Sequence, residues 1–414
     1  MRIAIDLQGI QSEGSRTRGI GRYSFEIVRN LVREYPQNTF ILVANASLLD
    51  LRQELESELK LSNVIYYEWY SPCPLSSISK NKTNLQLGSS LRSYAFSLLH
   101  ADIILITSFI EGFSDNCLTD FDKELLKTPI VSIFYDVIPL LNSHNYLRNN
   151  PKFSKFYKRK LKSMADLDAL LAISESSANE AAQYLGIKSN KVYNISSACN
   201  TLDFNDKQNH IPNVNLEKYK PYILYSGAGD PRKNLRRLLQ SFSQLPNTLR
   251  RYNLVLVGKL LIPEITLIDE WINEFKVDPF RVFKTGYISD ENLADLYKNC
   301  SLFVFPSLHE GFGLPILEAM NCGAPVIGSR STSVPEIINM NEAMFDPNNT
   351  IEITNLIIKS LTDNNFRTKL IQNSITQRKK FSWSYCVRAT NEVFLNVLKE
   401  HFIDYDSSNW IIIK

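Results

Sequence analysis

Two glutamates eight residues apart, Glu310 and Glu318, bracket a loop whose residue types could bind a phosphate or a sugar. The apolar run 302–305 precedes them and predicts a buried strand, and Gly311 and Gly313 follow in a tight turn. The next segment predicts a helix, whose free N–H groups and dipole attract phosphate or sugar oxygens. Glycine has no Cβ, so a ligand can approach the backbone closely. We therefore expect both carboxylates to face one crevice.

A second charged loop follows the apolar run 222–225 and holds Gly227, Arg232 and Lys233. Arginine can bind a phosphate group through two parallel hydrogen bonds, whereas lysine acts as a compact point charge. Cations are unfavourable at the start of a helix, so their presence there needs a compensating anion. A solvated basic helix start, continued by Arg236, is the alternative. We expect these two cations to bind a diphosphate.

Both loops are similar to those of a known family. The segment EGFGLPILEAMNCGAPVI at 310–327 resembles the signature of retaining glycosyltransferase family four, and 225–235 resembles the family's glycine loop ending in Arg-Lys-Asn. The family has the GT-B fold, an α/β architecture of two Rossmann-like doubly wound domains that face each other across a cleft. The resemblance implies retaining transfer of a hexose from a nucleotide sugar to a glycan or lipid-linked acceptor. The competing interpretation is a structural strand–loop–helix crossover with incidental carboxylates.

The resemblance also implies roles for single residues. Glu318 would bind the ribose hydroxyls of the donor, and Glu310 would face the donor sugar. The catalytic set is Glu310, Arg232, Lys233 and Asp136. The donor-binding set is Gly227, Tyr287, Gly311, Phe312, Gly313, Leu314 and Glu318. Tyr287 belongs to the loop 284–289, which would hold the base through its main chain.

The loop 9–21 resembles the family's flexible N-terminal loop, which closes over the donor phosphate and the acceptor. Its candidate residues are Arg18, Gly19, Gly21 and Arg22. The loop follows the first expected strand, and ligands bind at the carboxyl edges of parallel strands. Mere surface charge is the alternative interpretation of its arginines.

One position departs from the family pattern. Tyr135 stands before Asp136 where many relatives have a histidine. Asp136 could hydrogen-bond a sugar hydroxyl or serve as a base on the acceptor side, and both roles stay open. Ser174, after the apolar run 170–173, fits both a cleft loop and a helix N-cap, and we favour the cap.

Composition excludes several classes of protein. The 414 residues suggest two or three domains, and a formal net charge of +3 gives no argument for nucleic acid. Six scattered cysteines argue against a disulfide scaffold or a zinc cage and fit a reducing cytoplasm. The start of the chain predicts a strand and not a signal peptide, and no apolar run has the ~20 residues of a membrane span. Asp166 and Asp168 spell the D-x-D of metal-dependent glycosyltransferases, which we interpret as a coincidence. The GT-B resemblance implies neither a metal nor a cofactor.

Short apolar runs alternate with helical patterns, which predicts two parallel sheets. In the first half these runs are 3–7, 40–43, 64–67, 103–106, 130–134, 170–173 and 192–195, and in the second half 222–225, 254–257, 282–283, 302–305 and 325–327. We expect an N-terminal acceptor-binding domain at 1–200, a linker at 201–220 and a C-terminal nucleotide-sugar domain at 221–382. The tail 383–414 predicts a helix up to about Glu400, and the family resemblance implies that this helix crosses back to the first domain, with Trp383 and Trp410 as packing residues.

The segment 152–162 carries six basic residues and no acid, with aromatic residues interleaved. Such a helix can lie on an anionic membrane surface, which would bring the acceptor cleft near a lipid-linked glycan. A solvated helix face is the alternative. The expected location is the cytoplasm, including the inner face of the membrane.

Two rival functions remain at this stage: a GT-B sugar-nucleotide 2-epimerase, which needs no acceptor, and a non-catalytic partner subunit, which usually loses its charged donor residues. The segments around Asp136 and Glu336 look most like bacterial polysaccharide-assembly enzymes, many of them mannosyl- or rhamnosyltransferases. GDP-mannose is therefore the first expected donor, followed by UDP- and dTDP-sugars.

Overall fold

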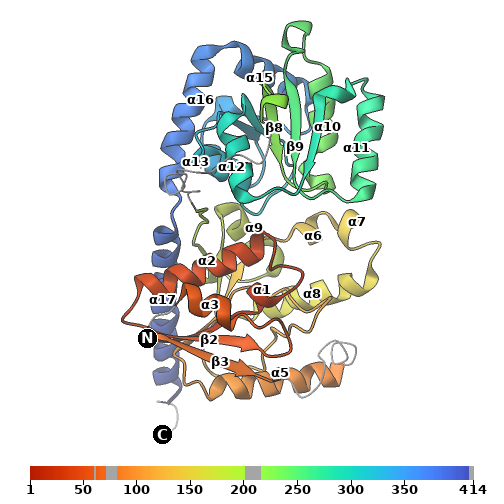
Figure 1. Cartoon of the computed structure of the whole chain (residues 1–414). Coiled ribbons are helices and arrows are strands. Elements are labelled where there is room, and N and C mark those ends of the chain that lie inside the picture. Colours follow the sequence, from red (N-terminus) through yellow and green to blue (C-terminus); the bar gives the residue numbers. More distant parts are fainter. Residues whose placement is uncertain (60–61, 71–81, 201–215, 410–414) are drawn as a thin grey trace. The chain divides into compact units, whose positions relative to one another are not determined.

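The computed structural model describes residues 1–59, 62–70, 82–200 and 216–409 (Figure 1). The chain divides into two compact units. Unit 1 comprises Met1–Ser197 together with Trp383–Lys414, and unit 2 comprises Ala198–Ser382. The linker expected at 201–220 lies outside the described residues up to position 215.

The described part of unit 1 is built on a seven-stranded parallel sheet with the order β3-β2-β1-β4-β5-β6-β7. Its strands are β1 (Arg2–Asp6), β2 (Thr39–Asn45), β3 (Val64–Trp69), β4 (Ile103–Ile106), β5 (Ile130–Phe134), β6 (Ala169–Ala172) and β7 (Val192–Asn194). The strand order reverses at β1, which pairs with β2 on one side and β4 on the other. In doubly wound sheets, ligands bind at the carboxyl ends of the strands at such a point.

Helices connect these strands. They are α1 (Gln8–Gln11), α2 (Gly19–Glu34), α3 (Arg52–Glu58), α5 (Lys82–Ser97), α6 (Ile138–Leu141), α7 (Ser143–Tyr146), α8 (Pro151–Ala165) and α9 (Glu175–Leu185). Local signals set their ends: the Ser174 side chain accepts a hydrogen bond from the Ser177 N–H at the start of α9, as expected of an N-cap. Gly186 ends α9 with φ +69°, a left-handed conformation that favours glycine.

Unit 2 repeats the scheme in its described residues with six parallel strands in the order β10-β9-β8-β11-β12-β13. The strands are β8 (Tyr222–Ser226), β9 (Asn253–Val257), β10 (Val282–Gly286), β11 (Leu302–Phe305), β12 (Val326–Ser329) and β13 (Met344–Phe345). The helices are α10 (Leu235–Ser243), α11 (Ile262–Glu274), α12 (Asp290–Asn299), α13 (Leu314–Asn321), α14 (Val334–Ile338), α15 (Thr350–Thr362) and α16 (Asn364–Gln377). Every residue of β8 and of β11 is buried, as expected for strands covered on both faces. Here the order reverses at β8, beside β11.

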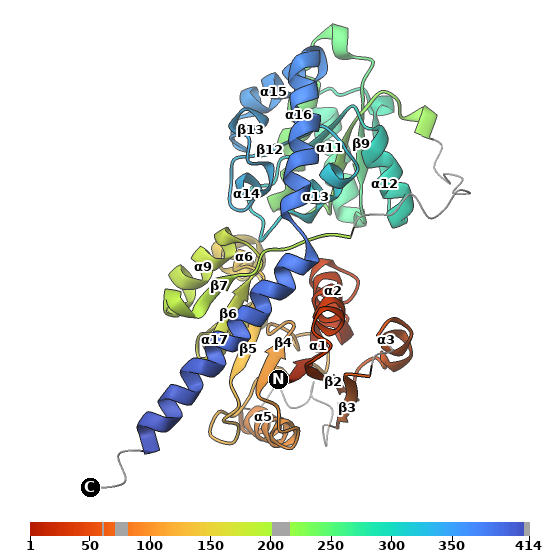
Figure 2. The same ribbon diagram turned by 90° about the vertical axis from the view of Figure 1, so that its left-hand side faces the viewer.

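The last helix, α17 (Trp383–Asn409), belongs to unit 1 and packs against α2 (Figures 1 and 2). The Trp383 ring packs on Tyr23, with centroids 5.3 Å apart, and Ser384 Oγ donates to Glu34 Oε2 at 3.0 Å. α17 extends beyond position 400, where the helical pattern in the sequence fades. Trp410 lies outside the described residues.

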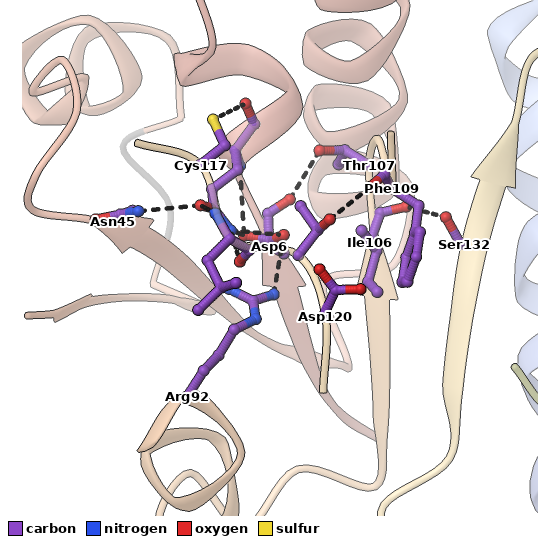
Figure 3. Close-up of polar contacts among 12 residues, drawn as sticks. Asp6, Asn45, Arg92, Ile106, Thr107, Phe109, Cys117, Asp120 and Ser132 are labelled. Carbon is purple, nitrogen blue, oxygen red and sulfur yellow. Dashed lines mark hydrogen bonds and ion pairs between the residues drawn. The ribbon is translucent and has the colours of Figure 1, made fainter. Parts of the chain in front are cut away.

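A buried ion pair fixes the carboxyl end of β1 (Figure 3). Arg92 reaches from α5 and donates from Nη2 to Asp6 Oδ2 at 3.0 Å, and both side chains are fully buried. Aromatic rings cover the guanidinium, with Phe121 at 4.2 Å and Phe96 at 4.6 Å. Asp6 also accepts from Gln8 Nε2, so the pair holds the first residues of the loop that follows β1.

Candidate functional site

Three charged residues expected to act on the donor form one buried ion cluster in unit 2. Arg232 Nη1 lies 2.7 Å from Glu310 Oε2, and Lys233 Nζ lies 2.6 Å from Glu310 Oε1. Lys233 is 8% exposed and Glu310 6% exposed, so little water screens the cluster. Two cations share the Glu310 carboxylate, and Asp230 Oδ1 lies 3.7 Å from Arg232 Nε, so these four side chains together carry no net charge.

Charge decides the protonation state of Glu310. Burial alone would raise the pKa of its carboxyl, but the positive charges of Lys233 and Arg232 outweigh burial and lower the pKa to about 2. Glu310 is therefore an anion throughout the physiological range. It cannot act there as a proton donor, and its clearest effect is to hold the two cations in place.

The loop after β8 is fixed by hydrogen bonds to its neighbours. Asp230 caps the short helix Pro231–Lys233 by accepting from the Arg232 N–H at 3.0 Å. Asn234 has φ +62° and donates from Nδ2 to the carbonyl of Pro306 at 3.0 Å, at the end of β11. The Leu308 N–H donates to the Arg232 carbonyl at 2.7 Å. These bonds join the loops that carry the cations and the carboxylate.

The loop after β11 is held from the other side by the residues before α14. Ser333 Oγ contacts the carbonyls of Glu310 (3.0 Å) and Phe312 (2.5 Å), and the Glu310 N–H donates to Thr332 Oγ1 at 3.0 Å. Gly313 has φ +118° and precedes α13, so a residue with a Cβ would be strained there. The loop therefore keeps a fixed shape at the start of α13.

Not every expected donor residue offers its side chain to a ligand. Phe312 is 4% exposed and packs edge-on against Phe381, with centroids 5.6 Å apart, so only its main chain is suited to binding. Leu314 begins α13 and is half-buried. Tyr287, just after β10, is 75% exposed. The loop after β10 thus exposes the Tyr287 side chain, whereas the sequence predicts main-chain contacts with the base.

Glu318 lies on α13 and accepts a hydrogen bond from the Tyr297 hydroxyl at 3.0 Å. The expectation that Glu310 and Glu318 face one crevice stays a prediction. Gly227 has φ +156°, and Gly258 after β9 approaches it so closely that a Cβ on Gly258 would lie 2.1 Å from the Gly227 carbonyl oxygen. The glycine loop after β8 is therefore packed against its neighbour.

In unit 1, α2 begins at Gly19, and Gly21 is buried in its first turn. A Cβ on Gly21 would lie 2.4 Å from the carbonyl oxygen of Arg16, so the turn requires glycine. Arg18 and Arg22 are exposed. The loop thus presents cations at the start of α2, and their role toward a ligand stays a prediction.

The unusual Tyr135 is tied to the interior of unit 1. Its hydroxyl donates to the Thr107 carbonyl at 2.9 Å and lies 2.9 Å from Ser24 Oγ on α2. Asp136 is half-buried, and its Oδ1 accepts from the Ile138 N–H at 3.0 Å at the start of α6. The structure gives Asp136 a helix-capping contact and leaves its two candidate chemical roles open.

Two other sequence features have structural roles. Asp168 Oδ2 accepts from the Ile130 N–H at 2.8 Å and lies 3.4 Å from Lys123 Nζ. In the basic segment, Lys160 is buried and pairs with Asp120 at 2.6 Å.

The aromatic residues of the basic segment belong to the core of unit 1. Phe153, Phe156 and Tyr157 pack inward against other core residues. These rings do not form a free apolar face for lipid, and the membrane contact of 152–162 stays a prediction. Four lysines of the segment remain exposed: Lys152, Lys155, Lys158 and Lys162.

Sequence reasoning missed Asp230, Thr332 and Ser333 as supports of the ion cluster. Asp230 precedes a proline, a pattern typical of a capped turn, and could have been found. The two hydroxyls lie just before Glu336, in a segment that resembles the family, but no pattern in the sequence predicts their hydrogen bonds.

Comparisons with known proteins show which proteins this chain resembles. The family model described as "Glycosyl transferases group 1" matches residues 206–377. The "Serotype-specific mannosyltransferase WbdA" of Escherichia coli is 33% identical over 409 residues, which cover 96% of this chain and 48% of that protein. The "O-antigen chain mannosyltransferase B" of Escherichia coli is 29% identical over 392 residues, covering 90% of this chain and 94% of that protein. This chain thus spans about half the length, or less, of the WbdA proteins that it matches.

Solved structures share the fold. Anabaena Alr3699/HepE in complex with UDP and glucose has a TM-score of 0.68 at 16% identity, covering 96% of this chain and 100% of that one. Sucrose-phosphate synthase (tll1590) from Thermosynechococcus elongatus has a TM-score of 0.68 at 18% identity, covering 97% of this chain and 100% of that one. Among the described residues, no helix combines the length and apolar character needed to cross a bilayer. The chain thus has two Rossmann-like doubly wound units of the GT-B fold, and its residues 206–377 match the group 1 glycosyl transferases.

Proposed function

We propose that this chain is a hexosyltransferase of bacterial surface-polysaccharide biosynthesis, which moves a sugar from a nucleotide-sugar donor to a hydroxyl of a glycan or lipid-linked acceptor. GDP-mannose is the first candidate donor, because the similar proteins WbdA and O-antigen chain mannosyltransferase B are mannosyltransferases by name. Structural neighbours were solved with UDP and with UDP-glucose, so UDP-sugars are the next candidates.

The ion cluster at the edge of the second sheet carries the proposal. Arg232 and Lys233 follow β8, and Glu310 follows β11, at the point where the strand order reverses. Glu310 holds the two cations at this edge, where they would bind the diphosphate of a nucleotide sugar. The N-terminus of α13 begins four residues after Glu310 and adds the positive end of a helix dipole.

The reaction balances without a protein nucleophile. The bond between the anomeric carbon and the donor phosphate breaks, and its electron pair leaves with the nucleoside diphosphate. The acceptor oxygen forms the new bond on the same face of the sugar, and its proton passes to the departing phosphate oxygen. Arg232 and Lys233 stabilise the charge that develops on that phosphate. In this route Glu310 positions the cations and supports the cationic sugar centre.

The proposal includes no metal and no cofactor, because the two side-chain cations can supply the positive charge. Glu318 would bind the donor ribose, Tyr287 would lie by its base, and the main chain of 311–314 would bind the donor sugar and phosphate. In unit 1, Arg18 just before α2 and Arg22 in its first turn would approach the donor phosphate. Asp136 would contact the acceptor.

Location belongs to the proposal as well. We place the protein in the cytoplasm, on the inner face of the membrane where a lipid-linked acceptor would lie. The exposed lysines of α8 would be attracted to anionic lipid by charge alone, since the aromatic residues of this helix pack into unit 1.

An acceptor-dependent assay tests the proposal. The full chain is incubated with GDP-mannose and a mannose-terminated glycan, and the release of GDP is followed. We expect Lys233→Ala and Arg232→Ala each to lower turnover at least ~100-fold, the scale of losing a charge-stabilising group. Lys369→Ala, at an exposed position on α16, is the matched control. Donor consumption that needs no acceptor would favour the epimerase, and a chain that binds no nucleoside diphosphate would favour a partner subunit.

A further inference from the structure

Unit 1 contains a cavity of about 350 Å³, and none of the donor-binding residues of unit 2 lines it. It lies by the carboxyl ends of β4 and β5, and Glu111, Asp136 and Arg18 line it together with aromatic residues of α8. Its volume is in the range of sites for small organic ligands. Every residue that lines it belongs to unit 1.

The wall of this cavity contains a buried polar group without a partner. Tyr157 is 2% exposed, and its hydroxyl has no hydrogen-bond partner among the described residues. Burial and the nearby negative charges of Asp136 and Glu180 raise the pKa of Tyr157, so the hydroxyl keeps its proton. A buried hydroxyl left unpaired is costly, and natural proteins rarely keep one unless water or a ligand supplies the partner. The Tyr157 hydroxyl therefore points to a ligand with a hydrogen-bonding group.

A buried carboxylate lines the same cavity. Glu111, which follows β4, is 6% exposed, and its Oε1 accepts from Ser15 Oγ at 2.5 Å and from Ser108 Oγ at 2.8 Å. Ser15 belongs to the loop after β1, so this contact lies where the strand order of the first sheet reverses. A carboxylate offers about four acceptor sites, so these hydroxyls leave it capacity to accept from a ligand.

An aromatic surface adjoins these polar groups. Phe113 is 44% exposed, and its ring packs against Phe153 and Phe156 with centroids 5.0 and 5.5 Å away. An exposed aromatic ring held in this way offers a flat apolar surface. A pyranose ring has one apolar C–H face and a rim of hydroxyls. The apolar face matches the aromatic surface, and the hydroxyls match the hydrogen-bonding groups of Glu111 and Tyr157. Arg18 faces two carboxylates in this lining, Glu111 and Asp136, so the cavity has no excess of positive charge for a ligand that carries phosphate.

We propose that this cavity binds an uncharged hexopyranose unit of the acceptor glycan, with Phe113 against the apolar face of the ring and with Tyr157 and Glu111 hydrogen-bonded to its hydroxyls. The inference rests on the proposed glycosyl transfer and names its acceptor subsite.

Saturation-transfer NMR with methyl α-mannopyranoside and the full chain tests this subsite without any donor present. We expect Tyr157→Phe to weaken the binding of the mannoside about fivefold, the scale of one lost hydrogen bond, with an unchanged or higher melting temperature. Tyr66→Phe is the matched control, because it also removes a buried hydroxyl without a described partner but lies on β3, outside the cavity. Phe113→Ala should also weaken binding, whereas Phe280→Ala, at an exposed ring of unit 2, should not.

Two results would overturn the subsite. One is that Tyr157→Phe and Phe113→Ala bind the mannoside as tightly as the parent chain does. The other is that a chain that binds GDP does not bind the mannoside. A parallel calorimetric titration with GDP tests the donor unit alone. The proposed function and the acceptor subsite therefore fail by separate measurements.

Discussion

The substitution Glu310→Gln tests whether the charge of Glu310 stabilises the ion cluster, because it keeps the shape of the side chain and removes its charge. Arg232 and Lys233 would then be left as like charges in a largely buried site. Removing one partner of a buried ion pair costs about 3–5 kcal/mol. The Arg232 side chain is 20% exposed, so we expect the lower end, about 3 kcal/mol. For a domain of the size of unit 2, each kcal/mol shifts the melting temperature by about 2–4 °C, which predicts a decrease of about 6–12 °C.

Circular dichroism melts of the full chain at neutral pH measure this decrease, with Glu342→Gln at an exposed position of unit 2 as the control. Inorganic pyrophosphate should raise the melting temperature of Glu310→Gln more than that of the parent chain, because the anion replaces the missing carboxylate. A variant that melts within about 1 °C of the parent would refute this reasoning about the buried pair.

The stability difference between the parent chain and Glu310→Gln should depend on pH. The pKa of Glu310 is lowered to about 2 in the folded chain, whereas an unperturbed glutamate has a pKa of about 4.3. A lowered folded pKa stabilises the protein above the unfolded value, and this stabilisation is lost as the pH falls through the folded value. The difference between the parent chain and Glu310→Gln should therefore be constant above about pH 5 and shrink toward pH 2. A difference that stays constant down to about pH 3 would contradict the assigned pKa.

Three further predictions follow from other contacts. Asp6→Ala leaves Arg92 buried without its carboxylate (Figure 3) and should lower the free energy of unfolding by about 3–5 kcal/mol in urea titrations. A loss under about 1 kcal/mol would show that the buried ion pair does not stabilise unit 1. Glu318→Gln should weaken GDP binding about tenfold and leave the binding of 2′,3′-dideoxy-GDP unchanged in calorimetry, since only ribose hydroxyls would reach the carboxylate; equal losses for both nucleotides would remove the ribose role. Replacing the exposed lysines of α8 by glutamate should abolish sedimentation with anionic vesicles at low salt, and a parent chain that never sediments would refute membrane attachment. These lysines are Lys152, Lys155, Lys158 and Lys162.

The sheet architecture could be predicted from the sequence because parallel strands are buried on both faces and appear as continuous apolar runs. Each apolar run that predicts a strand, from 3–7 to 325–327, overlaps a strand of the structure. The strand β13 was missed, since its two residues give no pattern. The far end of α17 was also missed, because its helical pattern weakens after position 400.

The site was predictable in its residue types and not in its contacts. Charged residues beside glycines identified Arg232, Lys233 and Glu310 as candidates. Glu310, however, lies 78 positions after Arg232 and 77 positions after Lys233 in the sequence. Only the placement of β8 next to β11 brings them together. Tyr157 was overlooked because an aromatic residue at helical spacing usually belongs to the core, and nothing in the sequence marks a hydroxyl as unpaired.

The most direct measurement of the central claim is calorimetric titration of the full chain with GDP and with guanosine. If the two cations after β8 bind the donor diphosphate, GDP binds and guanosine binds far more weakly, and Lys233→Ala removes most of that difference. Equal affinity for GDP and guanosine, or an unchanged preference for GDP in Lys233→Ala, would show that this cluster does not hold the diphosphate.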